Sequence, residues 1–173
     1  MCRAMDVETA IRTRRTHKAF TAEPLGRAEL EALLELADWA PNHNLTVPWR
    51  FRVVGPATLE RLKQAAGPEG AAKLDRCPTL VAVSCQLSGE PVQDEEDLHA
   101  TAIASYIVLL AAHARGLAGY WRTPGVLRTE AGQAAVGMDA GERFVALIHL
   151  GEPRQEKPAP DRVAAPDFVT YLA

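Results

Sequence analysis

Apolar and polar positions along the chain alternate in ways that predict both helices and strands. Leucine and alanine recur at helical spacing over residues 27–39, and a shorter helix is expected over residues 5–12. Residues 49–54 alternate apolar with basic side chains, which is typical of a strand with one buried face. Residues 79–85 form a nearly continuous apolar run of strand length, as expected for a central strand covered on both faces. The pattern therefore predicts a sheet packed against helices.

The longest apolar stretch, residues 100–114, predicts a buried helix. Polar side chains interrupt it, and it is shorter than the roughly 20 residues that span a bilayer, so we expect no membrane segment. Acidic residues at positions 94–97 precede it, where the helix dipole favours negative charge. A helix that is apolar on several faces needs several partners, so it belongs in the middle of a bundle or at a subunit interface.

The same signals predict four further elements, which are helices over residues 57–66 and 130–136 and strands over residues 117–121 and 143–150. Prolines and charged residues then fill an arm that ends in the β-prone residues 168–172. Such a segment invites aggregation unless it pairs with a sheet edge, of its own subunit or of another. We expect one α+β domain over residues 1–173, with a mixed central sheet flanked by helices and an extended C-terminal arm over residues 152–173.

Composition and charge narrow the possible functions. A chain of 173 residues with 47% hydrophobic content can bury one substantial core, and no shift in composition divides it. The net charge of -3 and the sequence pI near 6.0 argue against general nucleic-acid binding. The three cysteines lack a metal-like spacing, and the N-terminus lacks the apolar core of a secretory signal. We therefore expect a cytoplasmic protein with reduced thiols and with no nucleic-acid or membrane partner.

A basic run at residues 12–18 stands out in this acidic chain. Its potentially cationic side chains are Arg12, Arg14, Arg15, His17 and Lys18. Guanidinium groups grip phosphate well, and Thr16 adds a hydroxyl donor. An isolated run of charge is more often a solvated surface, so the run alone does not establish a site.

Motifs of other enzyme classes are missing from the sequence. It contains no Gly-x-Ser-x-Gly, so a hydrolase of that type is not supported. Its histidines lack the His-Glu-x-x-His spacing and its cysteines complete no zinc set, so we expect no metal. No Gly-x-Gly-x-x-Gly follows a predicted strand, which argues against a Rossmann dinucleotide site.

Four motifs, in this order, give the chain a resemblance to the FMN-dependent nitroreductases, and in particular to their short, minimal branch. They are Arg14-Arg15-Thr16, Ala40-Pro41-Asn42-His43, Pro48-Trp49-Arg50-Phe51 and Gly119-Tyr120-Trp121-Arg122-Thr123. The likeness covers nearly the whole chain, and the order of the motifs is more specific than any one of them. It implies an obligate homodimer with FMN sites between the subunits, residues 100–114 at the interface and the arm paired with the partner.

The resemblance also implies which residues bind the flavin. Arg14, Arg15 and Thr16 match the triplet that contacts the phosphate and ribityl oxygens. Lys18 matches a basic position near the pyrimidine edge, where positive charge favours the reduced ring. The remaining cofactor-binding positions are Trp39, His43, Trp121, Arg122, Thr123 and Lys157.

These further positions differ in what the resemblance implies for each. His43 matches a contact made across the dimer interface, and residues 121–123 match a segment whose backbone borders the ring. Trp39 stands where relatives place an arginine, so it either stacks on the flavin or belongs to the core. Among the tail residues Arg154, Lys157 and Arg162, we rank Lys157 first as a contact of the phosphate.

The implied activity is a ping-pong hydride transfer, in which NAD(P)H reduces FMN and a nitroaromatic or quinone-like acceptor reoxidises it. No catalytic side chain is expected, because the ring carries the chemistry. Three alternatives remain: another flavin reaction on the same scaffold, such as dehalogenation, flavin fragmentation or dehydrogenation; a non-enzymatic flavin-binding module; and a dimeric interaction protein without flavin. The segment over residues 65–77 is shorter than expected even for a member of the minimal branch, so the substrate preference of relatives does not carry over to this chain.

Overall fold

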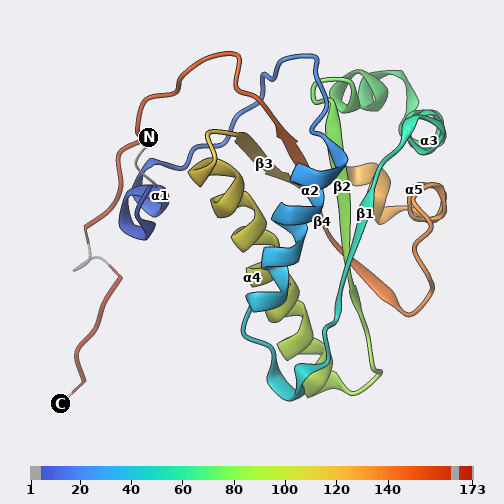
Figure 1. The fold of residues 1–173 in the computed structure, drawn as a ribbon. Helices are drawn as coiled ribbons and strands as arrows, with labels where there is room; N and C mark the ends of the chain where they lie inside the picture. The colour runs from blue at the N-terminus through green and yellow to red at the C-terminus, as the bar shows by residue number, and fades with distance from the viewer. Residues whose placement is uncertain (1–4, 165–167, 173) are drawn as a thin grey trace.

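The computed structural model describes residues 5–164 and 168–172, and it is built around a four-stranded sheet (Figure 1). The strands are β1 (Trp49–Val53), β2 (Thr79–Gln86), β3 (Ala118–Arg122) and β4 (Glu142–Gly151), in the spatial order β1-β2-β4-β3. The predicted α+β fold is confirmed, but the pairing of the four strands is antiparallel where a mixed sheet was expected. Every pairing between these strands is antiparallel, and the one parallel contact among the described residues is an isolated bridge between Thr16 and Gly119.

Helices cover both faces of the sheet. They are α1 (Val7–Thr13), α2 (Arg27–Leu34), α3 (Pro56–Leu74), α4 (Pro91–Ala114) and α5 (Glu130–Ala135), with short 3-10 turns over Glu35–Trp39, His43–Leu45 and Gly125–Arg128. Val81 and Val83 of β2 pack in the cluster formed with α2 and α4, whereas Leu80 and Ala82 pack in the cluster formed with α3 and α5. The continuous apolar run in β2 is therefore explained by burial on both of its faces.

Helix α3 extends further than expected. We expected a helix that closes at Gly67-Pro68, but a second helical segment follows directly and ends at Leu74. Gly67 has φ +69° and breaks the helix, and Pro68 suits the first turn of the segment that follows. The extra turns bring Lys73 back toward the sheet.

Helix α4 is the central helix. It is long and apolar enough to cross a membrane, yet Ala100, Ala104 and Val108 are buried against the sheet, as in the core helix of a folded domain. Ile103 and Tyr106 on its outer face remain exposed. An interface on that face stays a prediction.

The loop that comprises the second 3-10 turn and the residues leading from it to β1 has a strained backbone. Asn44, Leu45 and Val47 have positive φ angles of 57°, 50° and 48°, which are costly for a β-branched residue such as valine. Hydrogen bonds hold this loop against α4, because Thr46 donates its hydroxyl to the buried carboxylate of Asp97 at 2.5 Å. The side-chain oxygen of Asn42 also accepts a bond from the Val47 amide at 2.6 Å. The loop therefore has one imposed conformation.

The C-terminal arm leaves the sheet after β4 and passes α1 (Figure 1). Pro153 forms a bridge with Phe20, and the Arg154 amide donates to the Ala19 carbonyl at 3.3 Å. Beyond that bridge, no described residue of the arm belongs to a strand. Phe168, Tyr171 and Leu172 of the predicted pairing segment are exposed, and residues 165–167 and 173 of the arm lie outside the described residues. Pairing with a partner subunit stays a prediction.

A buried ion pair joins three strands. Arg52 of β1 donates to Glu142 of β4 at 2.5 and 2.8 Å and to the Ser84 hydroxyl of β2 at 2.8 Å, and Ser84 donates to Glu142. The side chain of Glu142 is only 1% exposed. Burial by itself would raise the pKa of Glu142, but the hydrogen bonds from Arg52 and Ser84 outweigh it and hold that pKa below its usual value of 4.5.

We predict that Arg52→Ala lowers the free energy of unfolding by about 3 kcal/mol, because it leaves a buried carboxylate without its cation. The lowered pKa stabilises the fold above pH 4.5, and this contribution is lost as pH falls from 4.5 through the folded-state value. Urea unfolding near pH 7 and near pH 3.5 checks both statements, since the difference between variant and wild type shrinks at the lower pH. The control is Arg12→Ala, which removes the exposed pair with Glu8 and is expected to cost under about 1 kcal/mol. Equal costs for the two variants would contradict the prediction.

Candidate functional site

The basic run crosses the free edge of β3. Helix α1 is capped by Asp6, which accepts from the Thr9 amide at 2.9 Å, and it ends at Thr13. Thr16 then bridges Gly119 of β3, and the His17 amide donates to the Gly119 carbonyl at 3.2 Å. Together with the bridge at Phe20, these contacts keep residues 14–20 close to an extended conformation beside the sheet.

A first cationic cluster surrounds the start of this segment. The Arg14 guanidinium lies 5.8 Å from the centroid of the Tyr106 ring on α4, a cation–π distance. The Nε atoms of Arg14 and Arg15 and the Nδ1 atom of His17 are buried, with no hydrogen-bond partner among the described residues. Buried polar atoms without partners are uncommon and mark a place where a ligand can complete the bonding.

Lys157 of the arm belongs to the same cluster. Burial lowers the pKa of His17, and the nearby charges of Lys157 and Arg14 lower it further, so this histidine is neutral at pH 7. His113 of α4, whose Nε2 lies 2.8 Å from the Thr13 hydroxyl, has its pKa lowered by burial and then by Arg14. The charge that remains at this end therefore comes from the arginines and Lys157, the tail residue that we ranked first.

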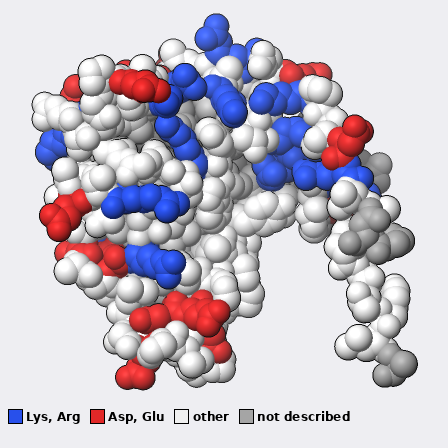
Figure 2. All heavy atoms as spheres, turned by 180° about the vertical axis from the view of Figure 1, so that it is seen from behind, with Lys and Arg blue, Asp and Glu red and all other residues white. Residues whose placement is uncertain are grey.

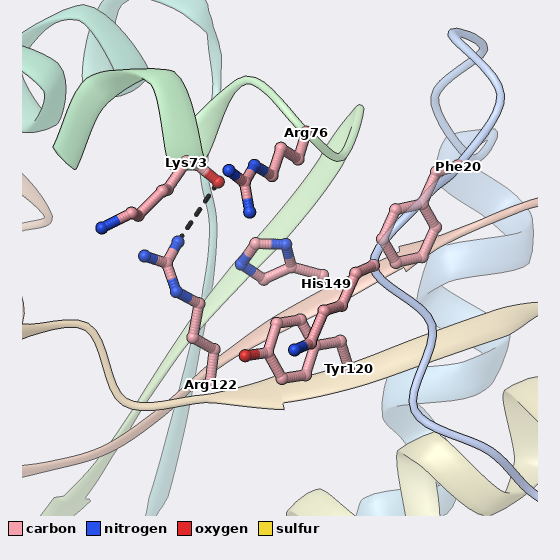
Figure 3. Close-up of a pocket in the computed structure, with 7 residues that line it drawn as sticks. Phe20, Lys73, Arg76, Tyr120, Arg122 and His149 are labelled. Carbon is pink, nitrogen blue, oxygen red and sulfur yellow. Dashed lines mark hydrogen bonds between the residues drawn. The ribbon is translucent and has the colours of Figure 1, made fainter. Parts of the chain in front are cut away.

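A second cationic cluster lines a pocket of about 210 Å³ (Figure 3). Its lining residues are Lys18, Phe20, Lys73, Arg76, Tyr120, Arg122 and His149. Tyr120 and Arg122 point the same way from β3, and His149 stands opposite Tyr120 on β4. The end of α3 supplies Lys73, whose carbonyl accepts a bond from Arg122 at 3.2 Å. Phe20 and Tyr120 add aromatic surface beside the His149 ring.

The charge of this pocket is not neutralised within the described chain. Lys73 pairs with Glu69 at 2.9 Å, but Lys18, Arg76 and Arg122 make no ion pair with a described carboxylate. Figure 2 shows Lys and Arg side chains gathered over the upper part of the molecule, around the hollow between the body and the arm. Such a surface attracts electron-rich ligands.

His149 is an unusual member of the pocket. It is only 2% exposed, and its Nε2 atom has no hydrogen-bond partner among the described residues. Burial, with a smaller effect from the Arg122 charge, lowers the pKa of His149 to about 4. The imidazole is therefore neutral at pH 7.

The other residues expected at the site lie elsewhere. The Trp121 side chain packs on the opposite face of β3, in the cluster with α4, and Thr123 is exposed just beyond the strand. His43 and Trp39 are also exposed. The loop of His43 is hydrogen-bonded to Asp97 of α4, whereas Thr13, which directly precedes the basic cluster, is hydrogen-bonded to His113 of the same helix. The two anchor points on α4 are about 24 Å apart along the helix. In one chain, His43 does not reach the basic cluster.

Five residues that line the pocket were not expected from the sequence; they are Phe20, Lys73, Arg76, Tyr120 and His149. His149 carried a usable signal, because it is the one polar side chain in the run 144–150. Lys73 and Arg76 carried none, since the helical segment that contains Lys73 and directly precedes Arg76 was not expected.

Known proteins that resemble this chain belong to one family. The model of the nitroreductase family matches residues 11–76. YfhC of Bacillus subtilis (strain 168), provisionally named an NAD(P)H nitroreductase, is 27% identical over 178 residues, which cover 94% of this chain and 92% of YfhC. The full-length match extends well beyond the segment that the family model covers.

Solved structures share the fold. A nitroreductase-like family protein from Bacillus cereus superposes with a TM-score of 0.89 at 22% identity, over 99% of this chain and 98% of that protein. A provisionally named nitroreductase from Desulfovibrio desulfuricans, solved in complex with FMN, superposes with a TM-score of 0.79 at 25% identity, over 96% of this chain and 97% of that protein. Sequence motifs, family model and fold agree, and the chain belongs to the nitroreductase family.

Proposed function

We propose that this protein is an FMN-dependent oxidoreductase that uses NAD(P)H to reduce nitroaromatic or quinone-like acceptors. The observation that carries the proposal is the pair of cationic clusters joined by residues 14–18. Four extended residues span about 13 Å. This one segment therefore presents positive charge at both ends of a site that is long enough for an extended mononucleotide. Unpartnered polar atoms at both ends fit such a ligand. The FMN complex of the Desulfovibrio relative supports the choice of cofactor.

The first cluster suits the phosphate end of FMN. Arg14 and Arg15 present guanidinium groups with free buried nitrogens, and Lys157 adds a point charge from the arm. Charge-assisted hydrogen bonds to phosphate are among the stronger polar contacts in proteins. Thr16 is held at the β3 edge by its bridge, where its exposed side chain is placed to meet the ribityl chain.

The pocket suits the ring end of FMN. Lys18 lies two residues beyond Thr16 and lines the pocket with Arg122. Positive charge in a partly desolvated pocket favours a ring that gains negative charge, so these side chains would raise the reduction potential of the bound cofactor. The aromatic surfaces of Phe20 and Tyr120 complete an apolar floor.

When bound, FMN supplies the redox chemistry by taking a hydride from NAD(P)H and passing it to the acceptor. The chain contributes binding, orientation and charge. His17 and His149 are neutral at pH 7, which leaves the cations as the charged groups of the two clusters. The thiols of Cys77 and Cys85 are buried, and burial raises the pKa of Cys77 to about 12, so neither serves as a nucleophile.

We further propose a homodimer in which the loop of His43 and Trp39 reaches the partner's site. The distance along α4 separates this loop from the site of its own chain. Exposed apolar side chains on the loop, on α4 and on the arm support a second copy as the covering surface; they are Trp39, Leu45, Ile103, Tyr106, Phe168 and Leu172. Large apolar side chains left exposed in this number are consistent with a protein interface.

The activity is tested by visible absorption of the purified protein, first alone, then after anaerobic NADPH and finally after a nitroaromatic or a quinone. We expect a yellow protein that NADPH bleaches and the acceptor recolours, because each half-reaction uses the same bound cofactor. A yellow protein that NADPH does not bleach would instead support a flavin-binding module. A colourless protein that takes up no added FMN would overturn the proposal.

Arg14→Ala is expected to raise the Kd for FMN about 10- to 100-fold, because a charge-assisted contact to the phosphate is lost. The measurement is a fluorescence titration of the apoprotein with FMN. The matched control, Arg12→Ala, removes an exposed arginine two residues away that is paired with Glu8, and it should leave the Kd unchanged. Unchanged FMN affinity in the Arg14 variant, with the fold intact by circular dichroism, would remove the phosphate assignment.

Mixed dimers test the shared site. In a hybrid of an Arg14→Ala subunit and a His43→Ala subunit, one site carries both changes and the other carries neither, if each site combines Arg14 of one subunit with His43 of its partner. We expect the purified hybrid to retain FMN in half of its sites with wild-type affinity, whereas each parent dimer binds weakly throughout. Light scattering reports the oligomeric state. A monomer, or a hybrid that binds no better than the parents, would contradict the shared site.

A further inference from the structure

We propose that His149 accepts a hydrogen bond from the imide N–H of the flavin pyrimidine ring, while cationic neighbours bind the oxygens on either side. This inference rests on the proposed function and deepens it, because it gives a flavin-recognition role to a residue outside the cofactor-binding segments. The pyrimidine edge presents an acceptor, a donor and an acceptor in sequence, namely two carbonyl oxygens and the N–H between them. A pocket that recognises this edge needs donors at its sides and an acceptor at its centre.

The pocket supplies the side donors. Arg76 and Arg122 carry guanidinium groups without a described carboxylate partner, and Lys18 adds an ammonium group. Arginine and lysine donate hydrogen bonds but cannot accept them. They therefore suit the carbonyl oxygens and leave the central N–H of the ring without a partner.

His149 supplies the acceptor. Figure 3 shows its ring pointing into the space between Arg76 and Arg122, and its Nε2 atom is buried with no described partner. An imidazole retains a lone pair only while it is neutral. Burial and the Arg122 charge lower the pKa of His149 to about 4, so the lone pair persists at neutral pH in the presence of these cations. The cations thus help to keep the histidine an acceptor.

The surroundings restrict the ring. His149 is fixed on β4, one of the two central strands, which pairs with both β2 and β3. Its ring centroid lies 5.4 Å from that of Tyr120 and 6.4 Å from that of Phe20. Tyr120 is the other side chain of the lining that can accept a hydrogen bond through a hydroxyl. It is half-buried, whereas the Nε2 atom of His149 is the buried nitrogen without a partner. This difference favours His149, and Tyr120 serves as the comparison.

The test pairs a change in the protein with a change in the ligand. The probes are riboflavin, FMN and 3-methylriboflavin, in which a methyl group replaces the imide hydrogen. Wild-type apoprotein is expected to bind riboflavin about tenfold more tightly than 3-methylriboflavin, the size of effect that one buried hydrogen bond produces. His149→Phe keeps an aromatic ring against Phe20 and Tyr120 but removes the acceptor. This variant should weaken the binding of riboflavin about tenfold and abolish the preference for riboflavin over 3-methylriboflavin.

Two further variants make the result specific. His149→Gln keeps a neutral acceptor and is expected to restore part of the discrimination, whereas Tyr120→Phe should leave it unchanged. Fluorescence titration gives the Kd values, and thermal melts confirm that each apoprotein is folded. Discrimination that survives in folded His149→Phe, or that disappears in Tyr120→Phe, would overturn the role of His149.

The probes also separate this inference from the proposed function. His149→Phe should weaken the binding of riboflavin and of FMN equally, because both carry the ring. Arg14→Ala should weaken the binding of FMN alone, because riboflavin has no phosphate. Wild-type protein that binds none of the flavins would refute the proposed function. Wild-type protein that binds both riboflavin and FMN, with His149→Phe indistinguishable from it, would refute only the inference about His149.

Discussion

The attachment of the basic segment to the free edge of β3 is the contact on which the site depends. One bridge, between Thr16 and Gly119, and one hydrogen bond, from the His17 amide to the Gly119 carbonyl, fix the segment beside the sheet. They place Arg14 near α4 and the arm, and Lys18 at the pocket under β3 and β4. Residues that are close in sequence therefore lie at the two ends of the candidate site. A basic run that was not attached to the sheet would not hold its cations at two defined positions.

The concentration of cations at the site opposes folding. Like charges near Lys18 and Arg122 repel one another in a partly desolvated environment, and nearby acids are already engaged, since Asp75 pairs with Lys63 and Glu69 with Lys73. Binding sites are often less stable than the folds that carry them, because function requires unsatisfied groups. An anionic ligand that binds only the folded chain relieves this repulsion and stabilises the protein by mass action.

Much of the fold could be predicted because strong periodicity is local. The apolar run of β2 and the long helix α4 were recognisable from residues 79–85 and 100–114 alone. The site was harder, because Lys18, Lys73 and His149 are distant in sequence and meet only after β3 and β4 pair. Lys73 was hidden further by the helical segment that resumes after Gly67. The role proposed for His43 came from resemblance, since no periodic pattern indicates what a second chain would contribute.

Helix α4 has a consequence for how the chain can vary in length. One end is bonded to the strained loop through Asp97, and the other is bonded to α1 through His113. Adding a single residue between these anchors would rotate one relative to the other by about 100° and shift them by about 1.5 Å. The number of residues between the two anchors on α4 is therefore fixed. Substitutions are tolerated between them, but insertions and deletions are not. Changes in length are more easily absorbed in the arm beyond the bridge at Pro153, where no described residue belongs to a helix or strand.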